Sequence, residues 1–249
     1  MPETRRASPT DIARPARVAL RPRDAATLVL VDRTGGSAPR VLMGRRRPDQ
    51  VFLPDTFVFP GGRVETADRA LARSHRLPPH EEQCLKIAMR GRASDIRATA
   101  LALAAVRETF EETGVIVGEP GDHDAPARTG GWVGFQAQGF RPRVGALAFF
   151  ARAITPPGRP RRYDTRFFLA DASEIAHRTD RSDGELLDID WFTLSRARTL
   201  KLPSITRHVI EDIAALMDRP HTDAVPFYFH RYGRLERTLL PRAQRPPET

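Results

Sequence analysis

Residues 96–113 are predicted to form a helix that is apolar on two opposite sides. One stripe consists of Ile96, Leu103, Val106 and Phe110. The other side carries apolar or small residues one turn before its acidic end, namely Leu101, Ala104 and Ala105. A helix that is apolar on both sides is covered on both sides. Ser94 or Asp95 can cap its start and Gly114 its end.

Three carboxylates follow on one side of this helix. Residues 107–114 read Arg-Glu-Thr-Phe-Glu-Glu-Thr-Gly, which places Glu108, Glu111 and Glu112 at positions i, i+3 and i+4. Like charges at these separations destabilise an isolated helix by roughly a few tenths of a kcal/mol per pair, so a compensating partner is needed, and a divalent cation would be one. A solvated helix face is the alternative. The apolar residues one turn earlier on the same side favour acids that line a pocket.

The rest of the chain interleaves strand and helix patterns. Apolar runs predict strands at 26–31, 40–46, 57–59, 144–154, 165–170 and 186–192. A second amphipathic helix is predicted at 204–217. Interleaved strands and helices favour an α/β sandwich with a mixed sheet over an all-β or all-α fold.

Length and composition indicate one domain with two polar ends. The chain has 249 residues, 40% of them hydrophobic, which suits a single core in residues 25–218. Residues 1–24 are predicted to be a disordered arm rich in Arg and Pro, and residues 219–249 a basic C-terminal tail. No apolar run approaches the roughly 20 residues that span a bilayer, and no signal-type segment begins the chain. We therefore expect a cytoplasmic protein without membrane contact.

The net charge of +9 does not by itself indicate a nucleic-acid partner. Residues 1–24 and 219–249 each hold six Arg against three acids, and the middle has no basic stripe with interleaved aromatics. No nucleic-acid partner is expected. Cys84 is the only cysteine and the histidines lack zinc-type spacing, which excludes an intrachain disulfide and argues against a thiolate or zinc site.

The acidic helix and an upstream Gly-Gly pair resemble the signature of the Nudix hydrolases, G-x5-E-x7-R-E-U-x-E-E-x-G-U, in which U is bulky and apolar. The matching residues are Gly62, Arg107, Glu108, Glu111, Glu112, Gly114 and Val115. Asp68 stands where the first Glu belongs, and Thr109 occupies an apolar position. Residues 69–106 separate the two halves of the signature, where the family has seven residues.

A split signature of this kind is similar to one branch of the family, which contains peroxisomal coenzyme A diphosphatases and bacterial relatives. The similarity includes Phe52-Leu53-Pro54, the Phe-Val-Phe-Pro-Gly-Gly run at 57–62, and the Arg-Tyr-Asp-Thr-Arg-Phe-Phe run at 162–168. It covers roughly residues 25–217 and implies a Nudix-type α/β/α sandwich with a mixed β-sheet. A different motif that the family links to coenzyme A, an Arg and a Gly just upstream of Phe-Pro-Gly-Gly, is absent from residues 50–56.

The resemblance also implies a reaction and a set of roles. Family members cleave a nucleoside diphosphate linked to another group, with Mg²⁺ or Mn²⁺ held by carboxylates. Glu111 and Glu112 would be the principal ligands, and Glu108 a further ligand or the group that takes a proton from water. The carbonyl of Gly62 would be another ligand. Arg107 is expected to orient a carboxylate rather than touch the substrate.

Further residues are assigned by their place around this motif. Gly61 and Gly62 are predicted to adopt backbone angles barred to other residues and to let a phosphate approach the main chain. Glu65 and Asp68 would be outer ligands or would fix the loop, and Glu65 is a candidate for substrate binding. Glu185 is predicted to supply one more carboxylate, with a surface turn acid as the alternative.

Three functions remain open at this point. Hydrolysis of coenzyme A or acyl-coenzyme A leads; hydrolysis of ADP-ribose, a dinucleotide or a nucleotide sugar keeps the same chemistry; a ligand-sensing domain without turnover is the third. A small nucleotide partner and a homodimer are expected. The insertion at 69–95, in which 81–90 has helical composition, is expected to build the substrate pocket or a subunit contact. A disordered surface excursion is the alternative.

Overall fold

A computed structural model describes residues 20–34, 36, 38–121, 127, 130–180, 184–218 and 224–242. The strands are β1 (Arg23–Asp32), β2 (Arg40–Arg46), β3 (Phe57–Val58), β4 (Gly61–Arg63), β5 (Val115–Pro120), β6 (Phe140–Pro142), β7 (Ala148–Ile154), β8 (Tyr163–Asp171), β9 (Ile175–Arg178), β10 (Leu186–Thr193), β11 (Ala224–Arg231) and β12 (Arg234–Pro241). The helices are α1 (Thr66–Leu71), α2 (Pro79–Lys86), α3 (Asp95–Thr113), α4 (Gly131–Gln136), α5 (Leu194–Arg198) and α6 (Ser204–Asp218).

A mixed sheet of nine strands forms the centre of the fold. Its order is β10-β2-β1-β8-β7-β11-β12, with β3 paired to β2 and β4 paired to β1. The pairs β1–β8 and β7–β11 are parallel. β1 and β2 pair only at Val31–Val41 and Asp32–Arg40, and beyond that point β4 pairs with β1 and β3 with β2. A second, three-stranded sheet has the order β6-β5-β9.

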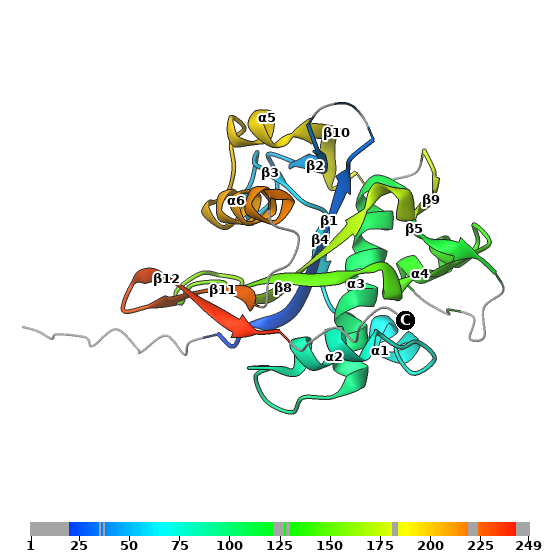
Figure 1. Cartoon of the computed structure of the whole chain (residues 1–249), viewed down its shortest axis with the longest axis horizontal. Helices are drawn as coiled ribbons and strands as arrows, with labels where there is room; N and C mark the ends of the chain where they lie inside the picture. The colour runs from blue at the N-terminus through cyan, green and yellow to red at the C-terminus, as the bar shows by residue number, and fades with distance from the viewer. Residues whose placement is uncertain are drawn as a thin grey trace, which may run out of the picture.

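Helices cover both faces of the large sheet, as Figure 1 shows with α3 on one side and α5 and α6 on the other. β1 explains why both faces need a cover, because it is apolar at every position from Leu28 to Val31. Leu28 and Leu30 point into the core that contains α3, whereas Val29 and Val31 belong to the core beneath α6. A strand buried on both faces reads as a continuous apolar run. The predicted α/β/α sandwich with a mixed sheet is confirmed.

The predicted elements are found with small shifts at their ends. The strand expected at 144–154 begins at Ala148, because Val144–Ala146 form a 3₁₀ turn. The helices expected at 96–113 and 204–217 match α3 and α6 within one residue. The sequence patterns did not reveal β4 or α1, which are short.

The prediction of a C-terminal tail is wrong for residues 224–241. These residues form the β11–β12 hairpin, which extends the large sheet through pairing of β11 with β7. Val225 and Tyr228 are buried in the two cores, and this burial gives the hairpin its place in the domain. At the other end, β1 begins at Arg23, slightly before the expected boundary. Most of the predicted arm, residues 1–19, lies outside the described residues.

The insertion is folded, which contradicts the alternative of a disordered excursion. It forms α1 and α2, and its apolar side chains are buried in the same core as α3, namely Leu71, Leu77, Cys84, Leu85 and Met89. Glu81, which is 2% exposed, accepts a hydrogen bond of 2.9 Å from the backbone N–H of Phe149 on β7. None of the helices in the described part of the chain combines the length and apolarity needed to cross a bilayer.

Candidate active site

α3 presents the acidic motif and is fixed at both ends. The Ser94 hydroxyl accepts a hydrogen bond from the N–H of Arg97 at 3.2 Å, and Gly114 ends the helix in the left-handed region at φ 71°. Every residue from 98 to 107 is buried. Glu112 is 2% exposed, so the acidic side of the helix is covered as its apolar neighbours predicted.

β4 brings Gly61 and Gly62 against the acids of α3. The N–H of Gly61 donates a 2.8 Å hydrogen bond to Oε2 of Glu112. Gly62 lies so close to Glu108 that an added Cβ would stand 2.6 Å from its Oε2. The structure therefore joins Gly61, Gly62, Glu108 and Glu112 in one place, as the sequence predicted.

The reason for the two glycines differs from the one predicted. Neither has a positive φ, since both lie in a strand that pairs with β1. Gly61 is required because a Cβ would meet the backbone of Ala26 and Thr27 at 2.5 and 2.7 Å. Gly62 is required because a side chain would occupy the place of the Glu108 carboxylate. The expectation of backbone angles barred to other residues was wrong, and the cause is steric.

Arg107 is the buried cation among these acids. Its Nε and Nη2 donate to the two oxygens of Asp68 at 2.9 and 3.0 Å, and its Nη1 donates to Glu111 at 2.5 Å. The same Nη1 lies 3.0 Å from Oε1 of Glu108. Nη2 also donates to the carbonyl of Arg63 at 3.0 Å. A guanidinium whose donors are shared among three carboxylates orients them, in keeping with the expected role.

Asp68 fixes the start of α1 as well as Arg107. One of its oxygens accepts from Arg107 and from Trp132 Nε1 at 2.8 Å, and the other accepts from Arg107 and from the backbone N–H of Glu65 at 2.7 Å. A carboxylate has about four lone-pair sites, and all four are used. Asp68 is therefore an anchor of the loop rather than an outer metal ligand. Glu65 lies at the N-terminus of α1, where its side chain accepts from Arg63 at 3.2 Å.

Burial dominates the electrostatics of the site. It raises the pKa of Glu108 to about 7; Arg107 opposes this shift and the charge of Glu111 adds to it. Burial would lower the pKa of Arg107, but the hydrogen bond to Asp68 and the charges of Glu108 and Glu111 raise it above the ordinary arginine value. In this structure, Glu108 and Arg107 thus form a buried pair in which the carboxyl group titrates near neutral pH.

The donor chemistry of these acids suits a hard divalent cation, although their present arrangement is not that of a closed metal site. Over the described residues, no three acidic, His or Cys side chains are already grouped to hold an ion. Arg107 and the Gly61 N–H occupy carboxylate oxygens instead. One guanidinium contacts three carboxylates, those of Asp68, Glu108 and Glu111, and this excess of negative charge would be balanced by a cation bound through oxygen.

The chain has counterparts of similar sequence and fold among known proteins. No family model matches the chain. The crystal structure of a NUDIX hydrolase from Alicyclobacillus acidocaldarius is 28% identical, covers 78% of this chain and 92% of its own, and has a TM-score of 0.59. In sequence and in fold, the chain is similar to Nudix hydrolases.

Two curated relatives show the same similarity. The acyl-coenzyme A diphosphatase NUDT19 of Gallus gallus is 29% identical over 190 residues, which cover 56% of this chain and 50% of that protein. The putative nudix hydrolase 7 of Caenorhabditis elegans is 29% identical over 158 residues, with coverage of 59% and 43%. The chain spans about half the length of these relatives.

Glu185 is separated from Gly61 and Gly62 by strand β2. Its backbone carbonyl accepts from Arg47 and Gln50, and the Gln50 amide also lies 3.4 Å from its Oε2. The strand that follows, β10, pairs with β2, whose other edge pairs with β3. The structure thus places Glu185 at the loop after β2, with β2 and β3 between it and β4. Its assignment as an additional carboxylate stays a prediction.

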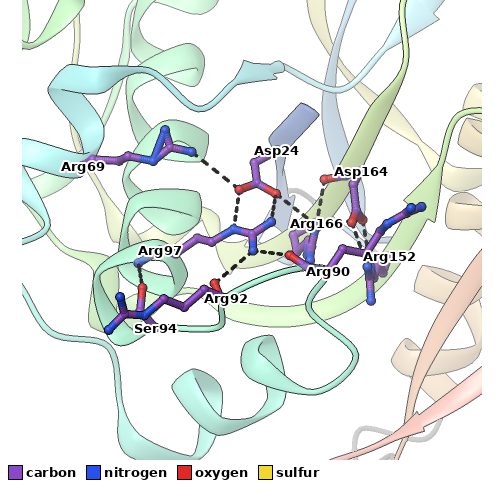
Figure 2. Close-up of polar contacts among 9 residues, drawn as sticks. All are labelled: Asp24, Arg69, Arg90, Arg92, Ser94, Arg97, Arg152, Asp164 and Arg166. Carbon is purple, nitrogen blue, oxygen red and sulfur yellow. Dashed lines mark hydrogen bonds and ion pairs between the residues drawn. The ribbon is translucent and has the colours of Figure 1, made fainter. Parts of the chain in front are cut away.

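The Arg-Tyr-Asp-Thr-Arg segment at 162–166 is part of a buried ionic network (Figure 2). Asp164 accepts from Arg152 Nε and Nη2 at 2.8 and 2.7 Å and lies 2.7 Å from Arg166 Nη1. Burial lowers the pKa of Arg166 to about 10. Arg152 also donates to the carbonyl of Ala88, which ties the network to the insertion. These contacts account for the Asp164 carboxylate without a role in substrate binding, whereas Nε and Nη2 of Arg166 are buried without a hydrogen-bond partner in the described part of the chain.

The same network reaches the start of α3. Arg97 binds both carboxylate oxygens of Asp24 at 2.6 and 2.7 Å, and Nη1 of Arg166 lies 3.9 Å from that carboxylate (Figure 2). Arg97 also donates to the carbonyls of Arg90 and Arg92, at 2.5 and 3.2 Å, in the loop before α3. The sheet, the insertion and α3 are therefore held together at the end of the helix remote from the acids.

Trp132 is the residue of the site that sequence reasoning did not find. It lies on α4, is fully buried and donates its indole N–H to Asp68. No motif connects the two positions in the sequence. Only an apolar, glycine-flanked hexapeptide at 131–136 marks the helix, and such a pattern is too short to place it.

Proposed function

We propose that this protein is a divalent-metal-dependent hydrolase that cleaves the diphosphate of a nucleoside diphosphate linked to another moiety, with coenzyme A or acyl-coenzyme A as its substrate. The observation that carries the proposal is the meeting of Glu108 and Glu112 with Gly61 and Gly62 in buried surroundings. Similarity to Nudix hydrolases supports the reaction, and similarity to an acyl-coenzyme A diphosphatase supports the substrate.

The metal is proposed to be Mg²⁺ or Mn²⁺, because carboxylate and carbonyl oxygens are the ligands that these ions accept. Glu111 and Glu112 are the proposed principal ligands, with Glu108 and the carbonyl of Gly62 as further ones. A bound ion would draw negative charge from the phosphate oxygens and lower the pKa of a coordinated water.

The side chains have distinct parts in the reaction. Water adds to one phosphorus, the bridging P–O bond breaks, and two phosphomonoesters leave. Glu108 either takes the proton of the water or acts as a ligand only; its raised pKa supports the former. Arg107 holds Glu108 and Glu111 in place rather than touching the substrate. Gly61, Gly62 and Glu65 are proposed to face the diphosphate, and Glu185 to approach as an additional carboxylate.

Hydrolysis of a substrate panel tests the proposal. Purified protein is incubated with coenzyme A, an acyl-coenzyme A, ADP-ribose, a dinucleotide and a nucleotide sugar, with Mg²⁺, with Mn²⁺ and with a chelator. Mass spectrometry should find adenosine 3′,5′-bisphosphate together with the phosphopantetheine product, and only in the presence of metal. Reaction in H₂¹⁸O should place the label on one of the two phosphates, which identifies the attacked phosphorus.

Matched variants separate the metal site from the fold. Glu111→Gln and Glu112→Gln keep side-chain size but remove charge, and each should lower kcat about a thousandfold, the equivalent of roughly 4 kcal/mol of transition-state stabilisation. Either variant keeping more than about a tenth of wild-type turnover at saturating Mg²⁺ would overturn the ligand assignment. A tenfold higher kcat/KM for ADP-ribose or a nucleotide sugar would change the proposed substrate. Absence of turnover on the whole panel would favour the ligand-sensing alternative. A cytoplasmic location and a homodimer stay predictions.

A further inference from the structure

Trp132 links α4 to the buried ion pair beneath the acidic helix. Its side chain is 0% exposed, and Nε1 donates to Oδ1 of Asp68 at 2.8 Å. The rest of α4 is held to α3 by aromatic packing, with the rings of Trp132 and Phe135 5.2 Å apart and those of Phe135 and Phe110 5.4 Å apart. The indole of Trp132 is thus held by its hydrogen bond to Asp68 and by ring packing against Phe135.

The hydrogen bonds of Asp68 form a chain that leads from Trp132 to the acids. Trp132 and Arg107 Nε share Oδ1 of Asp68, and Arg107 in turn contacts Glu108 and Glu111 through Nη1. Asp68 has no lone-pair site left once these donors and the Glu65 N–H are counted. Removal of the indole N–H would leave one oxygen of a fully buried carboxylate short of a donor, and Asp68 and Arg107 would readjust together.

α4 also lies directly against one of the acids. A Cβ added to Gly131 would stand 2.7 Å from Cγ of Glu111, so the first turn of α4 fits only because residue 131 has no side chain. Trp132, the next residue, anchors that turn. Its contact with Asp68 therefore acts on Glu111 by two routes, through Arg107 and through the placement of α4.

We propose that Trp132 is a positioning residue of the active site: its indole N–H holds Asp68, which fixes Arg107 between Glu108 and Glu111. This inference rests on the proposed metal-dependent hydrolysis. Trp132 reaches the acids of α3 through its hydrogen bond to Asp68 and the hydrogen bonds between Asp68 and Arg107. Partners that orient ligating side chains in this way contribute about 10- to 100-fold to metal affinity or activity in other metal sites.

A pair of tryptophan variants tests the role. Trp132→Phe keeps an aromatic ring but removes the donor, and Trp191→Phe, at the only other tryptophan, is the matched control. In Trp132→Phe the Mg²⁺ concentration for half-maximal rate should rise about tenfold, and the Mg²⁺-induced increase in Tm should shrink. Trp191→Phe should stay within about twofold of the wild type on both measures. Equal behaviour of the two variants would overturn the proposal.

A double-mutant cycle distinguishes positioning from packing. If Trp132 acts through Asp68, then Trp132→Phe should have less than about a twofold further effect in the Asp68→Asn background. A packing role predicts the same effect of Trp132→Phe in both backgrounds, and that result would refute the inference. The cycle is read from the Mg²⁺ concentration for half-maximal rate and from the Mg²⁺-induced shift in Tm.

A measurement on the wild-type protein does not depend on the stability of any Trp132 variant. The chain has two tryptophans, so its ¹⁵N spectrum contains two indole signals, which Trp191→Phe assigns. The Trp132 signal should move when Mg²⁺ is added and again in Asp68→Asn. A Trp132 signal that responds to neither change would overturn the inference. An inactive wild type with a responsive signal would refute the proposed reaction and keep the coupling between Trp132 and Asp68.

Discussion

Gly61→Ala should lower the stability of the fold, whereas Gly62→Ala should lower the activity. Both residues lie in β4 with backbone angles open to alanine, so only the space around the new methyl group decides the outcome. At Gly61 the methyl would meet the carbonyl oxygen of Ala26 at 2.5 Å and Cα of Thr27 at 2.7 Å. These are backbone atoms of the central strand β1 and cannot move independently of it.

At Gly62 the three atoms nearest to the methyl all belong to the far end of the Glu108 side chain, with Oε2 at 2.6 Å. An ordinary contact needs roughly 3.5 Å, so the carboxylate must be displaced by about 1 Å. A flexible side chain can move this far at little cost to folding. A displacement of about 1 Å at a reacting group can cost about a hundredfold in rate. Gly62→Ala should therefore fold normally and lose about a hundredfold in kcat, whereas Gly61→Ala should lose roughly 1–3 kcal/mol of stability through overpacking.

Urea unfolding and Mg²⁺-dependent turnover, measured on both variants, decide the matter. A normal unfolding midpoint with low kcat is expected for Gly62→Ala, and a lowered midpoint for Gly61→Ala. Full activity of Gly62→Ala would show that the position of Glu108 is not critical. Equal destabilisation of the two variants would show that the steric argument is wrong at Gly62.

The structure leads to four further expected outcomes. In the metal-free protein the pKa of Glu108 is raised to about 7, so below that pH the folded protein holds a proton that metal binding must release. The affinity for Mg²⁺, measured by calorimetry, should therefore rise by up to about tenfold per pH unit below pH 7 and level off above it. Glu108→Gln should remove that pH dependence. By the same sign, the metal-free protein should lose up to about 3 kcal/mol of stability between pH 4.5 and 7, and Mg²⁺ should restore it. Replacing residues 72–92 with a Gly/Ser linker removes the buried Leu77 and Leu85, so the free energy of unfolding measured with urea should fall by more than about 4 kcal/mol. A surface loop that only shaped the substrate pocket would change KM without this loss of stability. Ending the chain after residue 218 removes the β11–β12 hairpin and should lower Tm by several degrees, whereas removal of an unpacked tail would leave Tm unchanged.

The acidic helix could be predicted because its information is local. Its length, its two apolar sides and its caps at Ser94 and Gly114 depend only on consecutive residues, and the structure shows each of them as expected. The burial of Glu112 followed from the apolar residues one turn before it. Local periodicity was enough for these features, since tertiary packing and helix propensity agree along α3.

The connections to Arg107 could not be predicted because they depend on tertiary contacts. Asp68 is 39 residues from Arg107 and 64 from Trp132, and all three meet through hydrogen bonds that no spacing rule describes. The role of Asp68 as an anchor became clear only when its four donors were known. The C-terminal hairpin was missed for a different reason, because it buries few side chains and these do not alternate along β11 or β12. The buried ones are Val225, Tyr228 and Leu240.

The Asp68–Arg107 pair also explains how the family signature tolerates a long insertion. Asp68 lies in the first turn of α1, directly after β4, so its bond to Arg107 joins the two ends of the stretch 69–106. The entropy of closing a loop grows only with the logarithm of its length, and extending it from seven residues to this stretch costs about 1.5 kcal/mol. Burial of one leucine offsets about that amount, and the insertion buries Leu71, Leu77 and Leu85. The two halves of the signature are therefore held in register by a buried ion pair, so their spatial relation does not depend on their separation in the sequence.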